Sequence, residues 1–153
     1  MSNLLPVCPS CNGARGKETH FPVEDFRVHS PDDTVEKEGR LLLSPYYDDP
    51  HAHLYFPPAK DGTFFGTVTG ISKKGKMSVK IYNLQRVPLQ ERRRKAQEDI
   101  IKDLQYYLLK DRKRYINLWR DMHNGVLEFS AAVLSQARSW WKELNACTES
   151  AHT

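Results

Sequence analysis

Apolar residues in the C-terminal part of the chain recur at spacings of three and four, which is typical of amphipathic helices. Pro88 suits the first turn of a long helix, and Asn124-Gly125 suits its end. We expect a second helix from Val126 to about Leu144. Two helices across a short break predict an antiparallel αα-hairpin over residues 87–146, with 147–153 as a frayed tail. The apolar positions of the two helices are Leu89, Ile100, Ile101, Leu104, Tyr107, Leu108, Tyr115, Leu118, Trp119 and Met122, then Phe129, Val133, Leu134, Ala137, Trp140 and Trp141.

Shorter patterns typical of strands occupy residues 54–82. Leu54-Tyr55-Phe56 reads as a strand that ends at Pro57-Pro58. Lys60-Asp61-Gly62 predicts a turn, and Thr63–Thr69 has the composition of a strand. Lys73–Lys76 is interpreted as a hairpin turn, and the residues after it alternate with period two, as in a half-buried strand. The alternating positions are Met77, Val79 and Ile81 against Ser78, Lys80 and Tyr82. Together these segments predict a small antiparallel β-meander.

The first 53 residues are expected to be mostly turns and loops. Residues 1–23 are interpreted as a metal-binding knuckle followed by a short helix. Residues 24–40 are polar and acidic, which favours an exposed loop. Asp49, directly before Pro50, is suited to cap a brief helical turn through His51-Ala52-His53.

Composition indicates one domain, or one small domain with a helical appendage. The chain has 153 residues, of which 39% are hydrophobic and 27% charged. No apolar run reaches the ~20 residues that a membrane-spanning helix needs, and no signal peptide is recognised. The three cysteines include one C-x-x-C pair, which favours a metal in a reducing compartment over a disulfide scaffold. We therefore expect a cytoplasmic protein that does not contact membranes.

The net charge of +4 is concentrated in the C-terminal part of the chain. Residues 84–146 hold 13 Lys and Arg against 8 Asp and Glu. A surplus of this kind raises the affinity for phosphates by counterion release. Arg92, Arg93 and Arg94 form a short basic cluster and are candidate nucleic-acid-binding residues. The alternative is a solvated helix face with ion pairs such as Glu98–Lys102.

One motif carries candidate chemistry. It is the pattern N-L-x-x-x-C-x-x-C-N-x-x-x-x-K, which starts at Asn3 and contains Cys8, Cys11, Asn12 and Lys17. This pattern resembles the end of the HNH endonuclease motif, and more narrowly HNH proteins of bacterial defence and retron-type systems. The resemblance extends over roughly residues 1–95. It includes the segment Leu41–Leu54 and the later matches Asn83-Leu84-Gln85-Arg86 and Glu91-Arg92-Arg93.

The resemblance implies a ββα-metal fold and hydrolysis of DNA phosphodiester bonds with a divalent metal such as Mg²⁺. In the family pattern, the general base is a histidine that lies upstream of the Asn matched here by Asn3. This sequence starts at Met1, so we expect a truncated form that lacks the first His and the first C-x-x-C. Two thiolates supply half of the four ligands of a structural zinc site. Catalysis would then require another chain or an upstream segment.

The resemblance assigns roles to individual residues. Asn12 matches a ligand of the catalytic metal, and Asn3 matches the Asn that orients the loop. Cys8 and Cys11 match half of a zinc site. Two basic residues, Arg15 and Lys17, are suited to a nearby phosphate.

The fold class expected is therefore α+β: a partial HNH-like knuckle with a β-meander over residues 1–86, then the helical hairpin over 87–146. The favoured function is a truncated HNH-type endonuclease in phage defence, with DNA and an ATPase or another protein chain as partners. The alternatives are a non-catalytic DNA-binding or interaction module and a zinc-knuckle adaptor. His51 and His53 are either ligands of a metal or phosphate or packing residues. The tryptophans Trp119, Trp140 and Trp141 are interpreted as core or a protein interface rather than a base-stacking platform.

Overall fold

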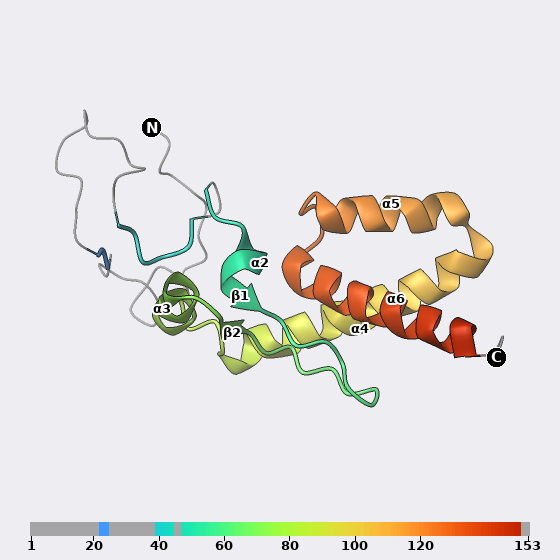
Figure 1. Cartoon of the computed structure of the whole chain (residues 1–153), viewed down its shortest axis with the longest axis horizontal. Helices are drawn as coiled ribbons and strands as arrows, with labels where there is room; N and C mark the ends of the chain where they lie inside the picture. Colours follow the sequence, from blue (N-terminus) through green and yellow to red (C-terminus); the bar gives the residue numbers. More distant parts are fainter. Residues whose placement is uncertain (1–21, 25–38, 45–46, 151–153) are drawn as a thin grey trace. The chain divides into compact units, whose positions relative to one another are not determined.

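The computed structural model describes residues 22–24, 39–44 and 47–150 (Figure 1). The described residues form two compact units. Unit 1 holds the described residues up to Tyr55, together with Val68–Arg86. Unit 2 holds Phe56–Thr67 and the chain from Val87 onwards. The predicted knuckle and most of the predicted loop, residues 1–21 and 25–38, lie outside the described residues.

Unit 1 combines two short helices with a two-stranded antiparallel sheet. Its elements are α2 (Pro50–His53), β1 (Leu54–Tyr55), β2 (Thr69–Gly70) and α3 (Lys73–Ile81). In the sheet, Leu54 is opposite Gly70 and Tyr55 is opposite Thr69. An isolated antiparallel bridge joins Val23 to Arg40. The fold is mixed α and β, as expected, although the sheet is smaller than the predicted meander.

The turn into β1 forms as predicted. The carboxylate of Asp49 accepts a hydrogen bond from the backbone N–H of His51 and caps α2, with Pro50 in the first turn. The strand that follows ends before Pro57-Pro58, because proline cannot donate a ladder hydrogen bond. This short helix and strand bring His53 and Leu54 beside α3.

The predicted hairpin turn and strand over residues 73–82 are wrong, because this segment is the helix α3. Ser72 caps it by accepting a hydrogen bond from the backbone N–H of Gly75. The residues that α3 buries are Gly75 and Ser78, three positions apart and therefore on one face. A Cβ at Gly75 would lie 1.9 Å from the carbonyl oxygen of His53. The buried face consists of small residues, and so the alternation of larger apolar residues misled the prediction.

The other predicted strand, Thr63–Thr69, is also mostly absent. Thr69 alone belongs to β2, and Thr63 makes an isolated bridge with Lys60 around the turn at Asp61-Gly62. Both turn residues have positive φ, 50° and 74° respectively. The predicted turn is therefore confirmed, whereas the strand after it is largely loop.

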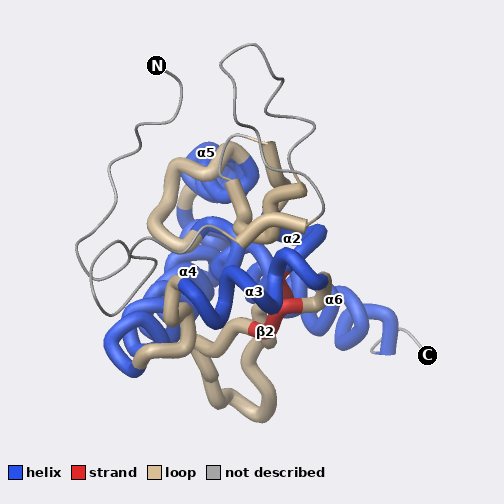
Figure 2. The backbone as a smooth tube through the Cα atoms, turned by 90° about the vertical axis from the view of Figure 1, so that its left-hand side faces the viewer, coloured by secondary structure: helices blue, strands red, loops and turns tan. Residues whose placement is uncertain are grey.

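Unit 2 contains three helices that pack against one another: α4 (Val87–Lys110), α5 (Arg112–His123) and α6 (Ser130–Ser150). Figure 2 shows these helices in blue. Their shared core consists of Ile100, Ile101, Leu104, Met122, Val133, Leu134 and Ala137. Several aromatic residues predicted as apolar positions, including Tyr115, Trp119 and Trp140, are partly buried against this core. The hydrophobic pattern therefore identified the core of unit 2.

The predicted two-helix hairpin is corrected to three helices. The first expected helix breaks at Asp111, whose side chain accepts a hydrogen bond from the backbone N–H of Arg114 and starts α5. An N-cap of this kind favours a new helix over continuation of the old one. The stop at Asn124-Gly125 is confirmed, with Gly125 at φ 70°. The last helix begins at Ser130, after Phe129 at φ 55°, and not at Val126.

Polar side chains of α4 and α6 attach the segment 56–67 to the helices of unit 2. Gln97 accepts a hydrogen bond from the N–H of Gly66 at 3.3 Å and donates one to the carbonyl of Pro57 at 3.3 Å. From α6, Ser135 donates to the carbonyl of Phe56 at 2.8 Å. These bonds satisfy backbone groups that no sheet satisfies. No helix among the described residues is long and apolar enough to cross a membrane.

Candidate functional site

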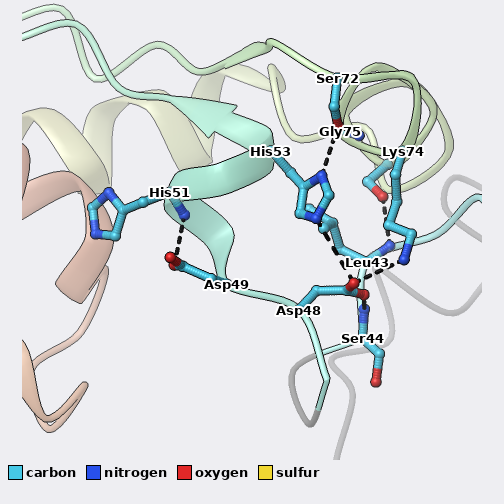
Figure 3. Close-up of polar contacts among 10 residues, drawn as sticks. Leu43, Ser44, Asp48, Asp49, His51, His53, Ser72, Lys74 and Gly75 are labelled. Carbon is cyan, nitrogen blue, oxygen red and sulfur yellow. Dashed lines mark hydrogen bonds and ion pairs between the residues drawn. The ribbon is translucent and has the colours of Figure 1, made fainter.

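The most connected polar cluster of unit 1 is centred on Asp48, just before α2 (Figure 3). Oδ1 of Asp48 accepts a hydrogen bond from Nζ of Lys74 at 2.7 Å, and Oδ2 accepts one from the backbone N–H of Ser44 at 2.7 Å. Nε2 of His53 lies 3.8 Å from Oδ1. The Asp48 side chain is 10% exposed, so the pair with Lys74 is partly shielded from solvent. Residues 26 positions apart in sequence thus meet at one carboxylate.

The cluster continues through the imidazole of His53 to the start of α3. Nδ1 of His53 lies 2.7 Å from Oγ of Ser72. The same oxygen accepts the N–H of Gly75, and its hydroxyl can donate to Nδ1 when the imidazole proton is on Nε2. This arrangement favours the tautomer that carries its proton on Nε2, on the side of Asp48.

Opposing effects act on the pKa of Asp48. Burial alone would raise the pKa of this carboxyl, but the hydrogen bond from Lys74, the N–H of Ser44 and the charges of Lys74 and His53 together lower it below its ordinary value. Asp48 therefore stays ionised to a lower pH than a free aspartate. Along with Leu43, Ser44 and Pro50, it lines a cavity of about 350 Å³.

The arrangement places an imidazole between a hydroxyl and a carboxylate, which is chemistry suited to proton transfer or to holding α2 against α3. Figure 3 shows His53 directed into the cluster and His51 directed away from it. His51 thus contributes its backbone N–H, and not its ring, to the contacts of this site. No three His, Cys, Asp or Glu side chains gather to hold a metal ion within the ranges 22–24, 39–44 and 47–150.

Six of the residues assigned by the HNH-like motif lie outside the described residues: Asn3, Cys8, Cys11, Asn12, Arg15 and Lys17. Their mutual placement therefore stays a prediction. The three basic candidates on α4 are described. Figure 1 shows this long helix in yellow-green to gold.

The basic cluster on α4 divides into exposed and buried side chains. Arg92 and Arg94 are 63% and 51% exposed, and they pair with Glu128 and Glu98. Arg93 is only 4% exposed, and its Nε donates to the carbonyl of Gly66 at 2.7 Å. This corrects the expectation for Arg93, since a buried guanidinium bound to a backbone carbonyl is not accessible to a phosphate. Exposed ion pairs such as those of Arg92 and Arg94 are weak enough to exchange for other anions.

Sequence reasoning missed the cluster around Asp48, Ser72 and Lys74. Lys73-Lys74-Gly75-Lys76 was interpreted as a turn, so Lys74 was not considered as a partner of a carboxylate. The signal that would have identified it is Ser72, a favoured N-cap residue immediately before the segment.

Comparison with known proteins gives two significant relatives, both from Bacillus mycoides (strain KBAB4). The Septu protein PtuB is 41% identical over 101 residues, which is 65% of this chain and 32% of PtuB. The Septu protein PtuA is 33% identical over 93 residues, which is 60% of this chain and 12% of PtuA. The chain therefore spans about a third of the length of PtuB and about an eighth of that of PtuA.

The two matches overlap within this chain, because together they cover more than its whole length. Similarity to PtuA and PtuB is thus not confined to separate halves. No family model matches the chain, and no solved structure matches it either. Over part of its length, the chain is similar in sequence to these two Septu proteins.

Proposed function

We propose that this chain is part of an HNH-type endonuclease that hydrolyses DNA phosphodiester bonds in bacterial defence against phage. The observation that carries the proposal is the 41% identity with the Septu protein PtuB, in a chain that also contains the HNH-like pattern from Asn3 to Lys17. Septu proteins belong to a phage-defence system. A sequence relative and a motif thus support the same class of protein.

The residues of the motif fit a metal in part. Thiolates such as those of Cys8 and Cys11 are preferred ligands of zinc, but they are two of the four that a structural site needs. The amide oxygen of Asn12 suits a divalent cation such as Mg²⁺. A divalent cation supplies stabilisation of the negative charge that develops on a phosphate during hydrolysis. Within this chain, Asn12 would hold that cation, Asn3 would orient the loop around it, and Arg15 and Lys17 would bind the DNA phosphates.

The proposal extends to partners. Likeness to PtuA and PtuB supports a partner protein, because the two relatives are different proteins of one Septu system. A second chain would also supply the metal ligands and the general base that the motif here does not include. The exposed cations Arg92 and Arg94 on α4 support contact with DNA phosphates.

Plasmid nicking tests the proposed activity. The full chain, alone and with an added PtuA-like protein, is incubated with supercoiled plasmid in Mg²⁺ or Mn²⁺ and in EDTA. We expect nicking that requires the divalent cation and that Asn12→Ala lowers by about 10²-fold or more. Ser10→Ala, which changes a variable position of the same motif, is the matched control and should keep the activity. Nicking by Asn12→Ala at the rate of the unaltered chain would contradict the assignment.

The second candidate is a non-catalytic DNA-binding module. The exposed basic residues of α4 favour it, because they do not depend on the metal site. Retention of DNA that weakens with salt, together with no nicking in any cation, would select this candidate over the endonuclease.

A further inference from the structure

Unit 2 contains a cavity of about 450 Å³ that is lined by the segment 59–64, α4 and α6. Phe64, Ile101 and Trp140 form its apolar walls. Phe64 and Trp140 are only partly buried, with one side packed on the core cluster. Lys60, Asp61 and Glu143 supply charges to the same cavity. Aromatic walls with a few polar groups are typical of sites for small planar ligands.

Gln136 offers this cavity an unused hydrogen-bond donor. Its Oε1 accepts the backbone N–H of Ala59 at 2.6 Å, which fixes the orientation of the amide, since a backbone N–H can only donate. Nε2 of Gln136 then has no acceptor among the described residues, although the residue is only 5% exposed. Every fully buried side-chain polar atom in the described part of the chain has a partner. The amide nitrogen therefore keeps an opening to the outside, and the cavity that Gln136 lines is where it opens.

The groups around the cavity restrict the chemistry of a ligand. Nε2 of Gln136 requires an acceptor, the carboxylates of Asp61 and Glu143 require donors, and the aromatic rings favour a flat π-system. A lysine or arginine side chain has no acceptor to offer, and Lys60 would repel it. A ligand with negative charge on the aromatic ring itself would be repelled by the two carboxylates, whereas Lys60 can accept an anionic group outside the ring. The ligand chemistry that fits is therefore a neutral aromatic ring that carries one hydrogen-bond acceptor beside two adjacent donors.

We propose that this cavity binds a guanine base. Guanine O6 accepts a hydrogen bond from Nε2 of Gln136, and its N1–H and N2 amino group donate to the carboxylate of Glu143. The base stacks on Trp140, and Lys60 binds the phosphate of the nucleotide. Glu143 has capacity for this, because its one described contact is a long hydrogen bond of 3.4 Å from Ser139.

The site stands apart from the nuclease proposal, because none of its residues belongs to the HNH-like motif. A guanine base has two sources, a free nucleotide and single-stranded nucleic acid. The carboxylates discriminate against adenine, which lacks the pair of adjacent donors. The preference for guanine over adenine therefore depends on the base alone, whether a free nucleotide or a nucleic acid supplies it.

Calorimetric titration of the full chain tests the proposal with two probes. One is guanosine 5′-monophosphate, and the other is an oligothymidine strand with a single guanine. We expect saturable binding of at least one probe, accompanied by quenching of tryptophan fluorescence. Replacement of guanine by adenine or cytosine should weaken binding by about tenfold to a hundredfold. Binding of the oligonucleotide alone would identify nucleic acid as the source, and binding of the nucleotide would identify a free nucleotide.

Three variants separate the site from general folding effects. Gln136→Glu keeps an oxygen for the N–H of Ala59 but removes the donor, and Glu143→Gln removes the carboxylate. Each should lower the affinity for guanine by about tenfold or more, and Glu143→Gln, at an exposed position, should do so with an unchanged melting temperature. Asp99→Asn changes an exposed carboxylate on α4 outside the cavity and should have no effect. Absence of binding to both probes, or equal binding of guanine, adenine and cytosine, would overturn the proposal.

Discussion

At the scale of single residues, neighbouring arginines in one short run occupy different environments. Arg92 and Arg94 point to solvent, whereas Arg93 lies on the buried face of α4 and binds the carbonyl of Gly66. Gly66 has φ 62°, and a Cβ there would lie 2.0 Å from the carbonyl oxygen of Gln90. The segment thus passes close to α4, where Nε of Arg93 satisfies the carbonyl of Gly66.

Arg93→Ala should destabilise unit 2, while Arg92→Ala should not. Loss of a buried hydrogen bond from a charged donor costs about 2 kcal/mol, since the carbonyl of Gly66 loses its partner. An exposed ion pair contributes less than about 1 kcal/mol. Urea denaturation of both variants measures the difference. Equal stabilities of the two variants would contradict the structural role of Arg93.

Asp48 should make unit 1 sensitive to acid. The pKa of Asp48 is lower in the folded protein than its ordinary value of 3.8, so the folded state binds fewer protons there than the unfolded state. The stabilisation from ionised Asp48 is complete above pH 3.8 and is lost as the pH falls through the lower folded value.

The measurement is urea denaturation from about pH 7 down to about pH 3, for the unaltered chain and for Asp48→Asn. The variant should be less stable near neutral pH by about 1–2 kcal/mol, and the difference should shrink in acid. Asp49→Asn is the matched control, because an Asn at that position still caps α2. A difference that grows as the pH falls would refute this account.

At the scale of elements, helix α3 shows that packing can select against local propensity. Gly75 lies inside the helix, where alanine is intrinsically favoured by about 1 kcal/mol. The backbone of β2 and of His53 approaches this position, however, and leaves no room for a Cβ. The glycine therefore permits the contact between α3 and the strand residues that position His53 and Ser72.

Gly75→Ala should destabilise unit 1, the opposite sign to the one that propensity predicts. The added methyl group meets the carbonyl oxygen of His53 at 1.9 Å, and overpacking of this kind costs about 1–3 kcal/mol. Lys80→Ala, on the exposed side of α3, should leave the stability within about 0.5 kcal/mol. Thermal denaturation followed by circular dichroism compares the two. A higher melting temperature for Gly75→Ala would show that the close approach does not exist.

The break between α4 and α5 depends on one carboxylate. Asp111→Ala should cost about 1 kcal/mol, because the backbone N–H of Arg114 loses the cap acceptor. Asp111→Asn retains an oxygen at the same place and should be nearly neutral. The stabilities of the two variants, measured in urea, test whether the side chain or merely the backbone starts α5. Equal losses would point to the backbone.

At the scale of the whole molecule, positive charge favours the binding of anionic partners. The net charge is +4, and the described basic residues of α4 and α5 contribute exposed side chains to it. Charge of this kind acts over a Debye length and weakens in salt. It supports binding to nucleic acid independently of any metal site.

Removal of Arg92 and Arg94 together should reduce the salt dependence of DNA binding. Each phosphate contact that is lost lowers the slope of log affinity against log salt by about 0.9. Filter retention of duplex DNA at several salt concentrations measures the slope. Arg138→Ala, an exposed arginine on α6, serves as the matched control. An unchanged slope in the double variant would exclude these two arginines from the DNA contact.

Much of unit 2 was predictable from sequence, because its signals are local. Apolar spacings of three and four identified the helices and their core, and Asn124-Gly125 identified a helix end. Asp49 before Pro50 likewise fixed a capped turn within four residues. A cap, a turn or an apolar stripe is encoded within one or two turns of chain, so the sequence determined these features without help from distant residues.

Only the tertiary structure decided the features that depend on distant contacts. Residues 73–81 became a helix because small residues at Gly75 and Ser78 let it pack closely, an advantage invisible in an apolar pattern. Arg93 was recognisable as a cation, but only the backbone of Gly66, 27 residues away, decided that it is buried. The hydrogen bonds between Asp48 and Lys74 and between Gln136 and Ala59 likewise join residues that are distant in the sequence. The physical reason is that burial and hydrogen-bond partnership belong to pairs of segments, whereas sequence patterns describe one segment at a time.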